Sequence, residues 1–167
     1  MSEICLDPKA YQYLSAWNPL LEGHKAPRKQ VVTVFLQKDD KILVLQRARK
    51  DAQYKLWGIP GGKLNSEEEP IVGLIREVYE ETQIKLSKDT PQLLGTAISF
   101  TPCDGQYGLY VFHAPITTQI DVQIDLSEHL KYRWVTIHEF QSLDLLTAQG
   151  EAFRIVEKPL ERAMKKI

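Results

Sequence analysis

The sequence predicts an α/β protein in which helices pack outside a mixed β-sheet. Segments rich in β-branched residues, which are typical of strands, follow one another closely along the chain. Segments with a helical spacing of apolar residues interrupt them, and this combination favours a sheet covered by helices. The 167 residues suffice for one domain with a sizeable core, or for one domain with an extension.

The N-terminal part of the chain predicts an extension, a hairpin and a loop. Residues 1–29 combine apolar side chains with Pro and Gly, so we expect an N-terminal extension packed on a domain formed by residues 30–167. Residues 31–36 and 42–45 are strand-like and a short polar turn separates them, which predicts a β-hairpin. Residues 47–56 are basic and polar, and we expect a loop there.

A helix is expected at residues 67–82. Ser66 occupies the N-cap position, and Glu69, three residues later, completes a capping-box pattern. Pro70 falls in the first turn of this helix, where its missing N–H does little harm.

The C-terminal part predicts three strands followed by two helices. The expected strands are residues 92–100, 107–115 and 132–135. Thr136 is expected to cap a helix at residues 137–145, because Glu139 stands in the capping-box position. Residues 148–166 are also helical in period, and Pro159 is expected to kink or divide that helix.

The end of the helix expected at residues 67–82 carries an acidic face. With an advance of about 100° per residue, Glu77, Glu80 and Glu81 fall within an arc of about 100°, beside a separate apolar stripe that faces the core. Like charges at this spacing repel, and the helix dipole disfavours them at the C-terminal end. Mg²⁺ prefers oxygen ligands and often shares them with substrate phosphates. The pattern therefore predicts a divalent-metal site, with a solvated acidic face as the alternative.

Charge and cysteine content argue against several other classes. The formal net charge of -1 provides no overall attraction for nucleic acid or anionic membranes, so local groups or a metal must hold any anionic ligand. Cys5 and Cys103 stand alone, and no Cys/His cluster indicates zinc. The N-terminus lacks the pattern of a secretory signal, and no run approaches the roughly 18 apolar residues of a membrane span. We expect a cytoplasmic protein with no membrane partner.

The segment from residue 62 to residue 84 also contains a set of fixed spacings. Five residues separate Gly62 from Glu68, seven more precede the run Arg-Glu-Val-Tyr-Glu-Glu at residues 76–81, and Ile84 follows three positions later. This pattern resembles the Nudix box, with Gln83 where the family usually has glycine. That glycine suits a left-handed helix C-cap, so Gln83 is expected to strain the cap modestly without removing a metal ligand.

The resemblance covers roughly residues 30–145 and implies a Nudix-type α/β/α sandwich with a mixed β-sheet. It implies these ligands for Mg²⁺ or Mn²⁺: Glu77, Glu80, Glu81 and the backbone carbonyl of Gly62. Arg76 would orient the glutamates, paired with Glu68. Apart from the resemblance, Arg76 could brace either Glu68 or Glu80 with a bidentate pair.

Residues outside the box are candidates for holding the substrate. Arg47 and Lys63 are candidate phosphate contacts, although either could be a solvated surface cation. Tyr107, on a strand with Tyr110 and Phe112, is a candidate for stacking on a base, although aromatic residues on a strand more often belong to the core.

A further acid is expected in the loop before the strand that contains Trp134, because the family often uses one there as ligand or base. Glu128 is the candidate, with Asp125 and Asp121 as alternatives. His129 is expected to be a surface or capping residue rather than a catalytic one.

The resemblance implies a Mg²⁺-dependent hydrolase that cleaves a pyrophosphate linkage in a nucleoside di- or triphosphate derivative. Glu80, Glu81 or Glu128 could take the proton of the attacking water. A nucleoside triphosphate is the default substrate, Pro102 is a weak indication of ADP-ribose, and capped RNA is the one nucleic acid kept open. The alternative function is a non-catalytic nucleotide-binding or regulatory Nudix module, and the extension could form a homodimer contact.

Overall fold

The computed structural model describes residues 12–16, 27–101, 105–146 and 149–166. Cys5, Cys103, Pro102 and most of the expected extension lie outside these ranges. Within the described ranges, no helix combines the length and the apolar character needed to cross a membrane.

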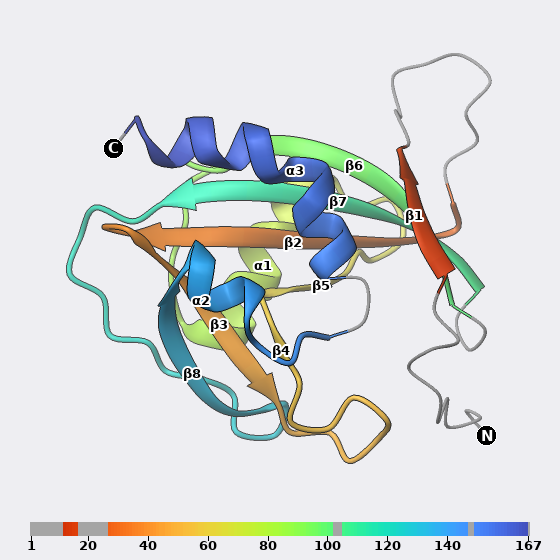
Figure 1. The fold of residues 1–167 in the computed structure, drawn as a ribbon, viewed down its shortest axis with the longest axis horizontal. Helices are drawn as coiled ribbons and strands as arrows, with labels where there is room; N and C mark the ends of the chain where they lie inside the picture. The colour runs from red at the N-terminus through yellow and green to blue at the C-terminus, as the bar shows by residue number, and fades with distance from the viewer. Residues whose placement is uncertain (1–11, 17–26, 102–104, 147–148, 167) are drawn as a thin grey trace.

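The described strands build one mixed sheet (Figure 1). Its main path runs in the order β1 (Gln12–Ala16), β6 (Gln92–Thr101), β7 (Gly105–Pro115), β2 (Lys29–Lys38), β3 (Lys41–Arg47), β4 (Trp57–Gly58). The short strand β5 (Gly61–Lys63) pairs with β2, and β8 (His129–Thr136) pairs with β3. Strands β2 and β7 are parallel and the other pairs are antiparallel, so the predicted mixed sheet is confirmed.

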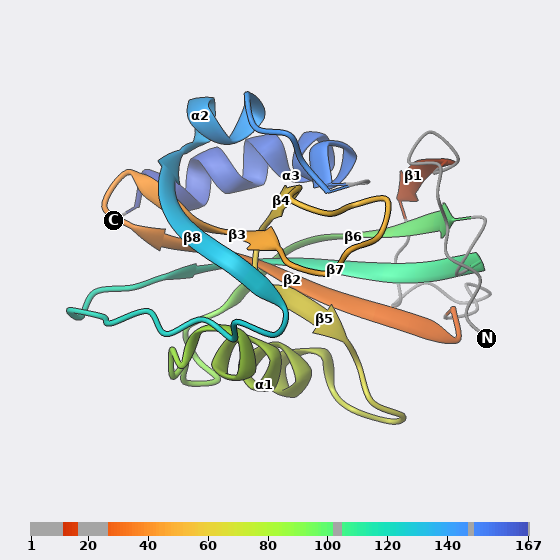
Figure 2. The ribbon, with the colours of Figure 1, turned by 90° about the horizontal axis from the view of Figure 1, so that it is seen from below.

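Helices cover both faces of the sheet (Figure 2). Helix α1 (Pro70–Thr82) lies on one face, and α2 (Ile137–Gln141) and α3 (Gln149–Met164) lie on the other. The alternation of side chains along β2 supplies both interfaces, since Val34 packs on the α1 side and Phe35 on the α3 side. Phe35, Phe140 and Phe153 meet edge to face, with ring centroids 5.6 to 6.3 Å apart. The predicted α/β/α sandwich is therefore confirmed.

The predicted hairpin is present, and the expected extension contributes a strand to the sheet. Strands β2 and β3 pair in the register Gln37 to Ile42 and Lys38 to Lys41. Strand β1, from within residues 1–29, pairs with β6 at the sheet edge, where Ala16 faces Ala97.

Helix α1 begins three residues later than predicted. Its N-cap is Glu69, which makes no side-chain capping bond, so the capping box proposed at Ser66 is wrong. Pro70 is at the start of the helix, as expected. Glu67 adopts a left-handed φ of 59°, which excludes it from a regular helix.

Helix α1 ends as the box pattern suggested. Gln83 forms the C-cap in the left-handed conformation, with φ at 60°. Its backbone N–H donates to the carbonyl of Tyr79, and its side-chain Nε2 donates to the same oxygen at 3.2 Å. Gln83 therefore adopts the conformation for which glycine is usually selected and compensates with an additional hydrogen bond.

The two predicted C-terminal helices are present, but they differ from the prediction in two respects. The capping box of α2 is confirmed, because Thr136 Oγ1 accepts from the N–H of Glu139 and the Glu139 carboxylate accepts from the N–H of Thr136. Helix α2 stops at Gln141, however, four residues earlier than predicted. Pro159 does not divide α3, since buried Val156 and Leu160 on either side of it hold the helix against the sheet.

Candidate active site

The last turns of helix α1 lie directly over strand β5. A Cβ atom added to Gly62 would lie 2.7 Å from Oε1 of Glu77 and closer still to the rest of that carboxyl group. Glycine therefore lets the Glu77 carboxylate rest on the backbone at this point. Gly61 is equally confined, because an added Cβ would overlap the carbonyl oxygen of Val32 on strand β2. These two contacts fix the distance between the acidic helix end and the sheet.

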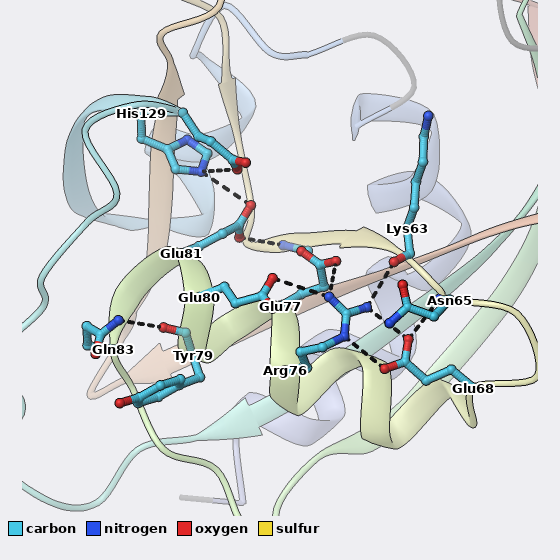
Figure 3. A network of polar contacts seen from close by, with 12 residues as sticks. Lys63, Asn65, Glu68, Arg76, Glu77, Tyr79, Glu80, Glu81, Gln83 and His129 are labelled. Atoms are coloured by element: carbon cyan, nitrogen blue, oxygen red, sulfur yellow. Dashed lines mark hydrogen bonds and ion pairs between the residues drawn. The ribbon is translucent and has the colours of Figure 1, made fainter.

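Arg76 connects three glutamates of the box (Figure 3). Its Nε and Nη2 each donate to an oxygen of Glu68 at 2.8 Å, and its Nη1 donates to Glu77 at 2.7 Å and to Glu80 at 3.2 Å. Nη2 also donates to the backbone carbonyl of Lys63 at 3.1 Å. The bidentate pair is thus made with Glu68, which the resemblance implied. The guanidinium group lowers the pKa of Glu68 to about 2 and fixes the orientation of Glu77.

Glu81 is held from two sides in a buried position. It is 6% exposed, its Oε2 accepts from the N–H of Gly61 at 2.9 Å, and its Oε1 lies 3.2 Å from Nε2 of His129. Burial raises the pKa of Glu81 above its usual value, because these contacts offset only part of the desolvation. Burial likewise raises the pKa of Glu77, against the opposing effect of Arg76. Carboxyl groups perturbed in this way are concentrated at functional sites.

The loop before β8 brings a fourth carboxylate to this place. Glu128 is exposed, and one of its oxygens lies 4.0 Å from Nε2 of His129. Glu81, Glu128 and His129 together place potential ligand atoms within 4.8 Å of one another. Of the two alternatives, Asp125 also lines a cavity beside the glutamates, and one of its carboxylate oxygens accepts from the N–H and the hydroxyl of Ser127. Asp121 lines neither of the two cavities that border the glutamates.

Two cavities flank the acidic group and share Glu77, Glu81 and Glu128 in their walls. The larger, of about 510 Å³, extends over β5 and reaches Arg47 and the neighbouring loop. The smaller, of about 370 Å³, lies on the other side of the helix end and includes Glu80. The three shared acidic residues therefore lie between two spaces that a ligand could occupy.

The predicted substrate contacts do not all come together. Arg47 and Lys63 both line the larger cavity, so the structure brings these two cations to the acidic group. Tyr107 lies at the start of β7 opposite Lys29, packs against the core on the α3 side and lines neither cavity. Its neighbour Tyr110 points to the opposite, α1 side of the sheet, where its hydroxyl donates to Gln30. The expectation that Tyr107 stacks on a base therefore has no geometric support.

The side chains at the helix end have the composition of a hard-cation site. Glu77, Glu80 and Glu81 offer only oxygen atoms, and the Glu77 carboxylate rests against the backbone of Gly62 because that residue has no side chain. The raised pKa values of Glu77 and Glu81 show that burial of their charge is incompletely compensated. A divalent cation would provide that compensation, and oxygen ligands suit Mg²⁺ or Mn²⁺.

Sequence reasoning underestimated His129 and missed Arg49. The side chain of His129 is 14% exposed and contacts Glu81, so the expectation of a surface or capping histidine is wrong. Arg49 lines the larger cavity beside Arg47. The sequence did contain a signal for Arg49, because it lies two residues after Arg47 in the segment that follows an expected strand. No local pattern could predict the contact between Glu81 and His129, which are 48 positions apart.

A mixed sheet between layers of helices, with carboxylates gathered over the strand that contains Gly61 and Gly62, is the arrangement of a Nudix-fold hydrolase. A sequence model of the NUDIX domain matches residues 26–156. The chain belongs to the Nudix family. The enzyme class predicted from the sequence, a Nudix-type hydrolase acting on phosphorus anhydrides, is confirmed by this match and by its pyrophosphohydrolase relatives.

Relatives match most of the chain. The uncharacterized Nudix hydrolase YvcI of Bacillus subtilis (strain 168) is 32% identical over 135 residues, which cover 78% of this chain and 80% of the relative. An RNA pyrophosphohydrolase of Zymomonas mobilis is 28% identical over 134 residues, covering 72% and 85% of the two chains. The crystal structure of a MutT protein from Methanosarcina mazei Go1 is 26% identical, has a TM-score of 0.66 and is matched over 81% of this chain and 97% of that chain.

Proposed function

We propose that this protein is a Mg²⁺- or Mn²⁺-dependent hydrolase that cleaves the pyrophosphate linkage of a nucleoside di- or triphosphate derivative, giving a nucleoside monophosphate and the remaining phosphate group. A nucleoside triphosphate is the proposed default substrate. The observation that carries the proposal is that Glu77 rests on Gly62 and shares the helix end with Glu80 and Glu81, next to a cavity whose wall also contains cationic side chains.

Glu77, Glu80, Glu81 and the carbonyl of Gly62 would hold the cation. When bound, a divalent cation neutralises charge on the pyrophosphate oxygens and lowers the pKa of water. Arg76 supports this set, because its guanidinium fixes Glu77 and Glu80 while it is anchored on Glu68.

The remaining residues of the site bind the substrate and move a proton. Arg47 and Lys63 line the cavity and would contact phosphate oxygens. The attacking water must lose its proton to a carboxylate within hydrogen-bond reach. Glu80 and Glu128 are the exposed acids of the site and suit that task, whereas Glu81 is already engaged by Gly61 and His129.

Two glutamine variants test the proposal. Glu80→Gln and Glu81→Gln remove one charge each and preserve the side-chain size, so we expect kcat to fall by orders of magnitude with little change in Tm. The assay incubates the protein and Mg²⁺ with a panel of nucleoside triphosphates, nucleotide sugars and capped RNA and identifies the products by mass, because a nucleotide sugar would give a nucleoside monophosphate and a sugar phosphate without free pyrophosphate. Unchanged turnover in both variants would falsify the proposed mechanism.

The same panel separates the alternative function. A non-catalytic nucleotide-binding module would bind a nucleotide with Mg²⁺ and release no product from any substrate. The cytoplasmic location and the homodimer contact expected from the sequence stay predictions, which cell fractionation and light scattering would check.

A further inference from the structure

Two arginines converge on one carboxylate in the loop between β3 and β4. Arg47 donates to Asp51 through Nε at 3.2 Å and through Nη2 at 2.6 Å. Nε of Arg49 lies 3.6 Å from the same carboxylate. Asp51 is fixed in turn by the backbone N–H of Gln53, which donates to it at 2.9 Å. This group consists of two positive charges and one negative charge, and so carries a net charge of +1.

The three side chains differ in what they present to the cavity. Arg47 and Arg49 line the larger cavity, whereas Asp51 is not part of its wall. The Asp51 carboxylate therefore contacts both arginines without itself lining the cavity. A guanidinium has five N–H donors, and the contacts with Asp51 use Nε and Nη2 of Arg47 and Nε of Arg49. Donors of both arginines are thus left for a ligand in the cavity.

The loop is positioned firmly against the acidic side of the site. The N–H of Arg47 donates to the carbonyl of Leu56 at 2.9 Å, and the N–H of Lys55 donates to the carbonyl of Arg47 at 3.0 Å. The N–H of Ala48 donates to the backbone carbonyl of Glu128 at 2.8 Å. The arginine loop and the loop of the fourth carboxylate are therefore joined by a backbone hydrogen bond, and the cavity has a basic end at the arginines and an acidic end at the glutamates.

A ligand that satisfies both ends must carry two anionic parts. The acidic end would hold, with its cation, the pyrophosphate that is cleaved. If the cation holds both phosphates of the cleaved bond, a nucleoside diphosphate sugar brings only its uncharged sugar to the arginines, and their donors are left without an anion. A chain of three or more phosphates places a further phosphate beyond the cleaved bond, and guanidinium groups bind phosphate through paired, charge-assisted hydrogen bonds.

We propose that Arg47 and Arg49, held in place by Asp51, form a binding site for the terminal phosphate of the substrate and thereby select compounds with at least three consecutive phosphates over nucleoside diphosphate sugars. This inference rests on the proposed function. It adds Arg49 as a substrate-binding residue and Asp51 as a positioning residue.

The test compares two substrates with the same base in four proteins. Wild type, Arg49→Gln, Asp51→Asn and the control Lys50→Gln are assayed on a nucleoside triphosphate and on the corresponding nucleoside diphosphate sugar. Lys50 is an exposed cation of the same loop that does not line the cavity, so Lys50→Gln removes an equal charge at a distance from the site.

We expect Arg49→Gln to raise KM for the triphosphate by about tenfold or more, with a much smaller effect on the diphosphate sugar. Asp51→Asn should raise KM for the triphosphate by a smaller factor with kcat nearly unchanged, because it loosens the arginines without removing them. Lys50→Gln should leave both substrates unaffected. Equal effects of Arg49→Gln on the two substrates, or no effect on either, would overturn the inference.

A binding measurement separates failure of this inference from failure of the proposed function. Calorimetry with a non-hydrolysable α,β-methylene nucleoside triphosphate reports the arginine site without turnover. If wild type cleaves neither substrate but Arg49→Gln weakens binding of this analogue relative to Lys50→Gln, the phosphate site stands and the hydrolase proposal falls. If both variants bind the analogue as tightly as wild type, the phosphate site is refuted, whatever the activity.

Discussion

Replacing Gly62 with alanine should damage catalysis while sparing the fold. The new Cβ would lie 2.7 Å from Oε1 of Glu77 and closer still to Oε2 and Cδ, inside the 3.0 Å below which Cβ atoms essentially never approach another atom. The carboxyl group must therefore retreat by on the order of 1 Å. A displacement of about 1 Å in a catalytic arrangement can cost about 100-fold in rate. Gly62 is not among the described glycines with positive φ, so alanine fits the backbone.

The assay measures three quantities on Gly62→Ala. We expect kcat for nucleotide hydrolysis to fall by about 100-fold, Mn²⁺ affinity measured by electron paramagnetic resonance to weaken, and Tm to change little. Wild-type turnover and Mn²⁺ affinity together would refute the reasoning, because they would show that the seat of Glu77 on Gly62 is not needed.

Gly61→Ala is the matched comparison. Its added Cβ would overlap the backbone oxygen of Val32 and lie 2.8 Å from Cα of Thr33, and neither atom can move without disturbing β2. We expect a loss of stability of about 2 kcal/mol, visible in urea unfolding. The two adjacent glycines should thus separate a functional requirement from a structural one.

Three further changes test local features by their effect on stability. Because Arg76 lowers the pKa of Glu68 to about 2 from the usual 4.5, this pair should contribute stability that is complete above pH 4.5 and lost as the pH falls towards 2. Urea unfolding at several pH values should show a shallower acid decline for Glu68→Gln, and an identical decline would contradict this assignment. Thr136→Ala removes the capping box of α2 made with Glu139 and should cost about 1 kcal/mol in chemical denaturation, whereas no loss would argue against the cap. Gln83→Gly relieves a left-handed φ of 60° and should raise the free energy of unfolding by about 0.5 kcal/mol. A fall in Tm would contradict this and would show that the lost side-chain bond to Tyr79 outweighs the relief.

Much of the fold follows from local patterns that the sequence displays. The β-branched run of β2, the polar turn before β3 and the Thr136 capping box each depend on residues within a few positions of one another. The acidic face of α1 is of the same kind, because helical geometry places Glu77, Glu80 and Glu81 together wherever the helix lies. These features were predicted and are present.

The start of α1 shows where local reasoning fails. Ser66 and Glu69 form a capping-box pattern, yet the helix begins at Pro70. Had it started at residue 67, Glu68 and Arg76 would be separated by about 12 Å along the helix axis, too far for a bidentate pair. The loop conformation instead turns Glu68 back to Arg76 and to the N–H of Asn65. A long-range ion pair thus overrides the local capping signal.

The sequence by itself determined that three carboxylates share the end of one helix, because this depends on regular helical geometry over a short stretch of chain. Only the tertiary structure decided what surrounds them. The pairing of β8 with β3 carries His129 to Glu81, and the end of β3 and the loop that follows it carry Arg47 and Arg49 to the same cavity. Such contacts depend on strand register and loop closure between distant segments, and neither leaves a periodic trace in the sequence.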